Sequence, residues 1–319
     1  MLTHLARYRH HDAVRWGVVI GDAMSPLSGS YATTADLIAG GEADWRNAAE
    51  LAPTVGLREI ELLSPVTAPC RVVCQGANYR QHAIESGLNP DQRSFNLFFD
   101  KTDASVTGPH ATVVRPAHVR LLDYEIELAL IVRKAVTSEV VVTDENLHEY
   151  VFGIAIANDL SARDVQLPQV QFLKGKSYRG FCPVGPYIAV PDRDEFGVLD
   201  QLELNLEVNG VQRQSDTTDN LVYRPAETLT ELSTFCNLSP GDIILTGTPH
   251  GCTATAPPAL VRRMLTALLP EHTLWDLFVR MQLKRPYLQP GDVVTSQIRS
   301  RDGSVDLGPQ RITIASPVN

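Results

Sequence analysis

Short strand-like runs fill most of the chain after Val72, and this pattern restricts the possible folds more than any other feature. Each run is rich in aliphatic and β-branched residues and ends at turn residues. The runs are VVCQG, VRLLDYEIELALIV, YVFGIAIAND, VGPYIAV, LELNLEVNG, DIILTG, DVVTSQI and QRITIA. Asn209 and Gly210 separate two alternating runs, which is the strongest signal for a tight hairpin in the chain. Because helices do not alternate regularly with these strands, the sequence predicts a mixed α/β fold that is mainly β and largely antiparallel, not a doubly wound sheet.

Residues 1–66 are predicted to form a small N-terminal α/β module. A turn at Gly21 and Asp22 separates two strand-like runs, and Thr33 with Asp36 three residues later is typical of a capping box at the start of a helix. A new apolar run begins after this module, so we expect a larger domain over residues 67–319.

One segment of the larger domain interrupts the strands. Over about residues 252–288, Leu, Met, Trp and Phe recur with helical spacing. We therefore expect a helical insertion there.

Composition and charge exclude several classes of protein. The five cysteines form no CxxC pair, so neither a disulfide framework nor a zinc finger is indicated, and a reducing compartment fits. The chain shows neither a signal peptide nor an apolar run of the ~18 residues that cross a membrane, which predicts a cytoplasmic protein. The formal net charge of -9 comes from interspersed acids and bases, so no nucleic-acid or membrane partner is expected.

Three acidic residues alternate along the run LLDYEIELALIV. Asp123, Glu125 and Glu127 would share one face, because strand residues two apart point to the same side. Carboxylates crowded away from water need a proton or a cation, and a hard divalent ion with oxygen ligands would satisfy them. A solvated edge strand explains the spacing equally well, and the tetrapeptide Glu-Ile-Glu-Leu also occurs at Glu59. Spacing alone leaves both interpretations open.

Polar residues also follow the apolar run VFGIAIAND. Asp159 ends that run and either reaches a ligand or caps a following helix. Arg163 and Gln166 lie just beyond it, where they are suited to hold a substrate carboxylate. The alternative for Arg163 is a surface ion pair with Asp164.

Three further segments carry residues that suit a site. His82 and Glu85 are three apart on one face of a predicted helix, where they form either a base with its orienting carboxylate or a surface pair. Lys176 follows Gly175, but Val170 stands where a phosphate-binding loop needs glycine, so that motif is rejected. The loop TGTPHG, which contains Thr248, either presents backbone N–H groups to an anion or serves only as a turn.

Five motifs occur in an order that resembles the fumarylacetoacetate hydrolase family. The motifs are GANYRQHAIE, DYEIELALI, ANDLSARDVQ, GKSYRGFCPVGP and ILTGTPHG. The resemblance spans about residues 70–251 and resumes near PGDVV. It implies a catalytic domain of the β-roll type, Mg2+ or Mn2+ as the cofactor, and a homodimer.

The resemblance also implies a role for each matching residue. The implied metal ligands are Glu125, Glu127 and Asp159. His82 and Glu85 correspond to a water-activating dyad, and Lys176 to a lysine that stabilises developing charge. The residues expected to contact substrate are Tyr79, Arg163, Gln166 and Thr248. Asp123 is outside this set and is expected to lie behind the ligands.

These roles predict a metal-dependent hydrolase that cleaves a carbon–carbon bond in a small anionic 2,4-dioxo acid, such as an acylpyruvate or fumarylpyruvate. The alternatives are a decarboxylase or keto–enol isomerase of an oxaloacetate-like diacid, and a catalytically silent binding protein. The helical insertion is expected to reshape the substrate pocket.

Overall fold

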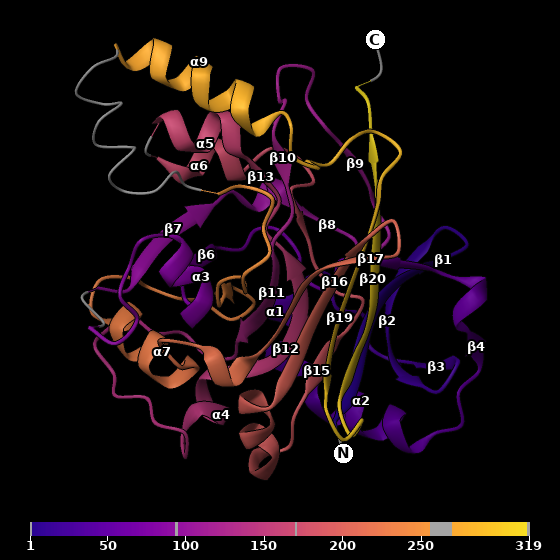
Figure 1. Ribbon diagram of the computed structural model, residues 1–319. Helices are drawn as coiled ribbons and strands as arrows, with labels where there is room; N and C mark the ends of the chain where they lie inside the picture. Colours follow the sequence, from indigo (N-terminus) through magenta and orange to yellow (C-terminus); the bar gives the residue numbers. More distant parts are fainter. Residues whose placement is uncertain (1, 93–94, 170, 256–269, 318–319) are drawn as a thin grey trace.

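An eleven-stranded sheet forms the centre of the computed structural model, which describes residues 2–92, 95–169, 171–255 and 270–317 (Figure 1). In spatial order its strands are β4 (Val55–Gly56), β3 (Ala23–Pro26), β2 (Ala13–Ile20), β1 (Thr3–His10), β15 (Ile188–Val190), β12 (Val151–Asn158), β11 (Ile126–Val132), β18 (Ile243–Leu245), β6 (Val72–Gly76) and β7 (Leu97–Lys101). A further strand, β5 (Glu61–Leu63), pairs with β1 outside this path. Within the described residues, every pair in this sheet is antiparallel except β18 with β6.

A second sheet packs against the first through a shared apolar core. Its order is β17 (Val211–Thr217), β16 (Leu202–Val208), β19 (Val293–Ser300), β20 (Asp306–Ala315) and β9 (Thr112–Val114). Ile126 and Leu128 of β11 share one core cluster with Leu204 of β16 and Val294 of β19. The hairpin predicted at Asn209 and Gly210 is confirmed: both residues have positive φ, 53° and 77°, as the tightest hairpin turns require.

Short elements complete the fold. The remaining strands are β10 (Leu122–Asp123) paired with β13 (Ser161–Ala162), and β14 (Cys182–Pro183) paired with β8 (Val106–Thr107). The described α-helices are α1 (Thr34–Gly40), α2 (Glu42–Glu50), α3 (Arg80–Glu85), α4 (Leu147–Tyr150), α5 (Arg163–Gln169), α6 (Phe172–Lys176), α7 (Pro225–Ser233) and α9 (Glu271–Gln282). The 3-10 helices are η1 (Leu57–Glu59), η2 (Asp103–Ser105), η3 (Arg193–Asp200) and η4 (Thr218–Asn220). Strands therefore dominate, which confirms the predicted mixed α/β, mainly β class.

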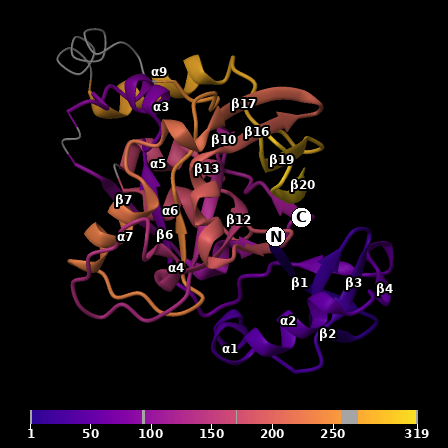
Figure 2. The same ribbon diagram turned by 90° about the horizontal axis from the view of Figure 1, so that it is seen from below.

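The N-terminal segment lies at one end of the molecule (Figure 2). Its helices α1 and α2 cover β2 with Leu37 and Trp45, and α1 begins with the predicted capping box of Thr33 and Asp36. The segment also continues the main sheet, because β1 pairs with β15. Hydrogen bonds thus cross the predicted boundary at residue 66, and the division into two domains stays a prediction.

The predicted helical insertion contains α9, which packs Val279 against Leu121 and Tyr287. Residues 256–269 of that insertion lie outside the described residues. Among the helices that the structure describes, none is long and apolar enough to cross a membrane.

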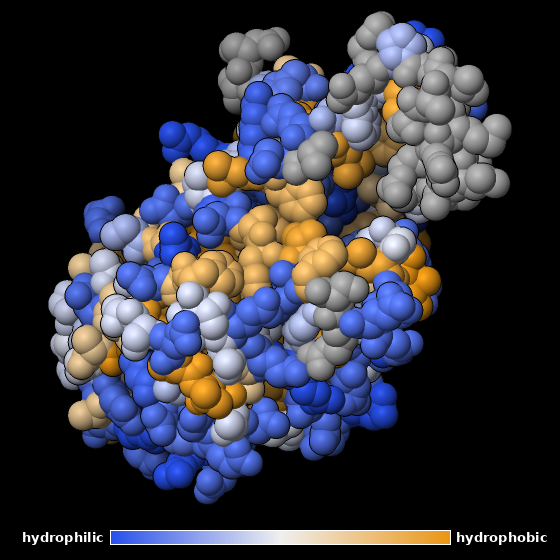
Figure 3. All heavy atoms as spheres, turned by 90° about the vertical axis from the view of Figure 1, so that its left-hand side faces the viewer, coloured by the Kyte–Doolittle hydropathy of each residue, from blue (hydrophilic) through white to orange (hydrophobic). Residues whose placement is uncertain are grey.

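Apolar side chains gather in the middle of the face that carries α3, α6 and α9 (Figure 3). Exposed hydrophobic residues on these helices include Ile84, Leu173 and Met281. Exposed apolar patches commonly mark interaction sites. The homodimer stays a prediction.

Candidate metal centre and active site

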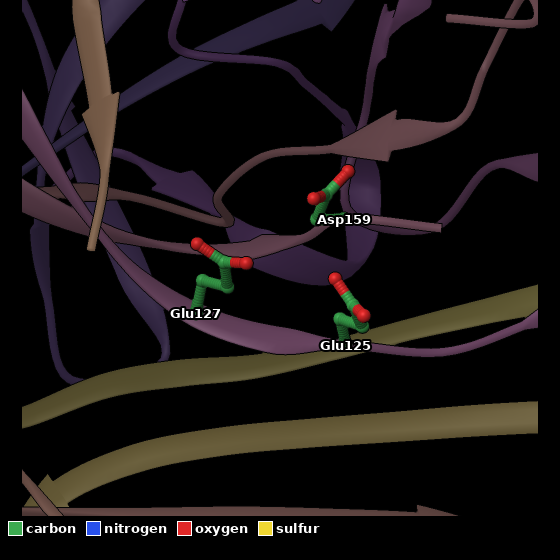
Figure 4. Close-up of side chains that lie close together, drawn as sticks. All are labelled: Glu125, Glu127 and Asp159. Carbon is green, nitrogen blue, oxygen red and sulfur yellow. The ribbon is translucent and has the colours of Figure 1, made fainter. Parts of the chain in front are cut away.

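Three carboxylates meet where β11 begins and β12 ends. Glu127 lies in β11, and Glu125 directly precedes the first residue of this strand. The two residues are two apart in extended chain, so their side chains point to the same side. The antiparallel register places Ile126 opposite Asn158, and the N–H of Asp159 donates to the carbonyl of Glu125 at 2.8 Å. Asp159 therefore joins the two glutamates (Figure 4), with one ligand oxygen from each residue within 4.8 Å of the others.

Burial makes this group electrostatically demanding. Glu125, Glu127 and Asp159 are 4%, 1% and 0% exposed. Burial, together with Asp159 and Glu125, raises the pKa of Glu127 well above its ordinary value. Burial alone would also raise the pKa of Glu125, but Arg163 and Lys176 lower it below its ordinary value. An all-oxygen set of buried carboxylates fits a hard divalent ion such as Mg2+ or Mn2+.

Two lysines each donate a hydrogen bond to a different carboxylate oxygen of Asp159. Lys176 Nζ donates to Asp159 Oδ2 and Glu125 Oε2, each at 2.5 Å, so it bridges two of the carboxylates. Lys101 Nζ donates to Asp159 Oδ1 at 2.5 Å and to the carbonyl of Phe181 at 2.9 Å. Both lysines are buried, and their charges offset part of the carboxylate charge.

Arg163 contacts both Glu125 and Asp123. Arg163 Nε donates to Asp123 Oδ2 at 2.9 Å, Nη1 to Gln166 Oε1 at 3.0 Å, and Nη2 to Glu125 Oε1 at 2.5 Å. The alternative interpretation, a surface ion pair between Arg163 and Asp164, is therefore wrong, because Arg163 is buried and faces inward. Asp123 orients Arg163 through this hydrogen bond, and its expected place behind the metal ligands stays a prediction.

His82 and Glu85, the predicted dyad, lie on α3. His82 is half-buried, and burial lowers its pKa, although the charge of Glu125 opposes that shift. Glu85 is exposed, and its Oε1 accepts a hydrogen bond from Gln81 at 3.3 Å. Among the described contacts none joins His82 to Glu85, so the dyad stays a prediction.

The TGTPHG loop turns its backbone toward the carboxylate group. Gly247, at a φ of 89°, donates its N–H to Glu127 Oε2 at 2.7 Å. The loop thus directs a backbone N–H at the carboxyl group of Glu127. Thr248 donates its hydroxyl to the carbonyl of Ile126 at 2.9 Å. Tyr79 is fully buried, and its hydroxyl has no hydrogen-bond partner among the described residues.

Sequence reasoning missed two residues of this site. Lys101 closes the run LFFDK, and Cys252 directly follows the TGTPHG loop. Cys252 Sγ lies 3.9 Å from Glu125 Oε1, and burial with Glu125 and Asp123 raises the pKa of this thiol well above its ordinary value. The sequence marks Cys252 only by its position directly after this loop, and it gives no signal for Lys101.

Comparison with protein families decides the relationship that the motifs suggest. The model of the fumarylacetoacetate (FAA) hydrolase C-terminal family matches residues 71–315. The chain belongs to the fumarylacetoacetate hydrolase family. Curated relatives include the mitochondrial oxaloacetate tautomerase FAHD2A of Bos taurus, 36% identical over 201 residues, and the oxaloacetate tautomerase YisK of Bacillus subtilis (strain 168), 36% identical over 211 residues.

These matches cover part of each chain. The bovine alignment covers 62% of this family member and 62% of the relative, and the bacterial alignment covers 65% and 68%. Solved structures of similar proteins cover the whole fold. A probable 2-hydroxyhepta-2,4-diene-1,7-dioate isomerase from Mycobacterium abscessus has a TM-score of 0.73 and 28% identity, covering 100% of both chains. A fumarylacetoacetate hydrolase from Exiguobacterium antarcticum has a TM-score of 0.72 and 27% identity, covering 99% of this chain and 100% of that one.

Proposed function

We propose that this member of the family is a divalent-metal-dependent keto–enol tautomerase acting on a small 2-oxo diacid of the oxaloacetate type. The buried group of Glu125, Glu127 and Asp159, with the cations Arg163 and Lys176 against it, carries this proposal. Relatives named oxaloacetate tautomerases support tautomerisation over the carbon–carbon hydrolysis that the motifs alone predict.

Glu125, Glu127 and Asp159 would hold Mg2+ or Mn2+, because both ions accept carboxylate oxygens. When bound, such an ion supplies positive charge beside the carboxylate and 2-oxo oxygens of the substrate, where negative charge grows as C3 loses a proton. Burial alone would lower the pKa of Lys176, but Asp159 and Glu125 raise it above its ordinary value. Lys176 therefore stays charged at neutral pH and stabilises the growing negative charge rather than giving up a proton.

We assign the proton transfer to His82. Because burial lowers the pKa of His82, its imidazole is neutral at pH 7 and can accept the proton that leaves C3. Return of this proton to the 2-oxo oxygen completes the enol and restores neutral His82. The reaction consumes no water, so it needs no carboxylate to orient a water-activating base. A tautomerase is therefore consistent with the exposed position of Glu85, which contacts Gln81.

Arg163 and Gln166 are assigned to the second carboxylate of the diacid. A planar guanidinium matches the geometry of a carboxylate, and Asp123 and Gln166 already fix the orientation of Arg163. This assignment predicts that an acid with two carboxylates binds the site more tightly than a simple 2-oxo acid.

A carbon–carbon hydrolase acting on acylpyruvates is the second candidate. It is favoured by the position of His82 within electrostatic reach of Glu125, since the same imidazole can deprotonate a water molecule. The two reactions leave different products: tautomerisation preserves the carbon skeleton, whereas hydrolysis releases pyruvate and a carboxylic acid.

The test follows the near-ultraviolet absorbance of enol-oxaloacetate with purified protein, before and after EDTA treatment and re-addition of Mg2+ or Mn2+. We expect metal-dependent interconversion without release of CO2. Pyruvate and a carboxylic acid released from acylpyruvates would assign the hydrolase instead, and CO2 from oxaloacetate would assign a decarboxylase. Absence of turnover with every substrate would leave a silent binding protein.

A further inference from the structure

The end of helix α9 is tied to the short segment 253–255. Gln282 Nε2 donates to the carbonyl of Thr255 at 3.0 Å, and Arg285 Nη1 donates to the carbonyl of Thr253 at 3.0 Å. The hydroxyl of Tyr287 donates to Gln282 Oε1 at 2.8 Å, which fixes the orientation of the amide. Gln282 and Tyr287 are buried, so water competes little for these bonds.

Segment 253–255 in turn holds Asp123. The N–H groups of Thr253 and Ala254 donate to Asp123 Oδ1 at 2.9 Å and Oδ2 at 3.0 Å. Asp123 is 0% exposed, so its position depends on these protein donors and not on solvent. Its Oδ2 also accepts the hydrogen bond from Arg163 Nε.

Arg163 is the end of this chain of contacts. Its three nitrogens are fixed by Asp123, Gln166 and Glu125. A shift of segment 253–255 would move Asp123 and would turn the guanidinium away from Glu125. Forked hydrogen bonds are sensitive to such turns, because both must stay aligned at once.

We infer that Gln282 and Arg285 are positioning residues that set the orientation of Arg163 through segment 253–255 and Asp123. The inference rests on the proposed function only where it assigns Arg163 to a substrate carboxylate. It gives the helical insertion a defined role, because the end of α9 then determines how firmly the site holds the second carboxylate of a diacid.

The first test uses no substrate and no metal. In protein labelled with 15N-arginine, the Nε–H resonance of Arg163 is identified by its loss in Arg163→Lys, and its exchange with solvent is measured. We expect Gln282→Leu and Arg285→Met each to speed this exchange at least about fivefold, because the hydrogen bond to Asp123 opens more often. The matched control is Arg280→Met, an exposed residue on the same helix for which no contact is described.

Arg285 is itself exposed, so Arg285→Met keeps the test informative if Gln282→Leu, at a buried position, impairs folding. Unchanged Arg163 exchange in folded Arg285→Met would overturn the inference. This result is separate from the proposed function, because it can be obtained whether or not the protein turns over oxaloacetate.

A kinetic cycle tests the consequence for substrate. For the diacid, we expect Gln282→Leu to raise KM about fivefold with kcat nearly unchanged, and to have no further effect in an Arg163→Met background. An equal rise of KM in that background would show that Gln282 acts by another route and would overturn the inference.

Discussion

The tetrapeptide Glu-Ile-Glu-Leu occurs twice in this chain, at residues 59–62 and 125–128, with opposite surroundings. In the first copy Glu59 ends the 3-10 helix η1 and Glu61 begins β5, so the two glutamates do not share the face of one strand. Both are exposed, and Glu61 pairs with Arg9 at the surface.

In the second copy both glutamates are buried and point into a group of charged side chains. Ile126 and Leu128 pack into the core on the other side of β11. Arg163 and Lys176 contact Glu125, and the N–H of Gly247 contacts Glu127. Identical residues thus acquire different chemistry, because burial and neighbours decide whether a carboxylate can serve as a metal ligand.

The sharpest way to break this comparison is to make the same change in both copies. We expect Glu125→Gln to lower kcat/KM at least about 1,000-fold with loss of bound metal, because it removes a charged ligand from a buried site. Glu59→Gln should change kcat/KM less than about twofold, as surface substitutions usually do. Kinetics and metal analysis of both purified variants provide the measurement. Full activity in metal-free Glu125→Gln would contradict the difference between the copies.

Substitution of His82 tests whether catalysis depends on a base near Glu125 in the second copy of the tetrapeptide. His82→Ala should lower kcat about 100-fold, which is within the usual contribution of a general base, while metal content stays native. Glu85→Gln should lower kcat less than about threefold, because Glu85 is exposed and contacts Gln81. Equal losses in the two variants would favour the predicted dyad and the hydrolase.

The pH dependence of metal binding sharpens the comparison further. Since the pKa of Glu127 is raised, metal-free protein retains a proton there below that pKa, and an incoming ion must displace it. The affinity for the divalent ion should therefore rise with pH, by about tenfold per pH unit until the pKa of Glu127 is passed. Titration calorimetry in buffers of different ionisation enthalpy should show release of about one proton per bound ion. Affinity that falls as pH rises would contradict the assignment of Glu127.

The smallest effect is expected at the exposed copy. Glu61→Gln breaks the surface ion pair with Arg9 and should lower the free energy of unfolding by about 0.2–1 kcal/mol. The loss should shrink at high salt, because exposed charges are screened. Denaturant unfolding at two salt concentrations measures it. A loss above about 3 kcal/mol would mean that this copy is not simply a surface pair.

Local features of the fold could be predicted from the sequence, and contacts between distant segments could not. The hairpin at Asn209 and the capping box at Thr33 depend on neighbouring residues, so their local patterns suffice. The hydrogen bond from Lys101 to Asp159 joins residues 58 positions apart, and no spacing rule indicates it. The pairing of β1 with β15, across the predicted domain boundary, could not be predicted from the sequence for the same reason.

The site shows the same limit. Strand alternation predicted that Glu125 and Glu127 share one face, but the identical tetrapeptide at residues 59–62 spans the end of η1 and the start of β5 instead of one strand. The four residues alone therefore do not determine which copy is buried. The helix α3 has six residues, too few for periodicity to reveal which face is buried, so the exposure of Glu85 was not predictable.

The most direct test of the difference between the two copies is the anomalous diffraction of a crystal grown with Mn2+. We expect one strong peak among Glu125, Glu127 and Asp159, at about 2.0–2.3 Å from their carboxylate oxygens, and none at Glu59 or Glu61. A fully occupied peak elsewhere, with no density among the three buried carboxylates, would contradict the metal centre on which the proposed function depends.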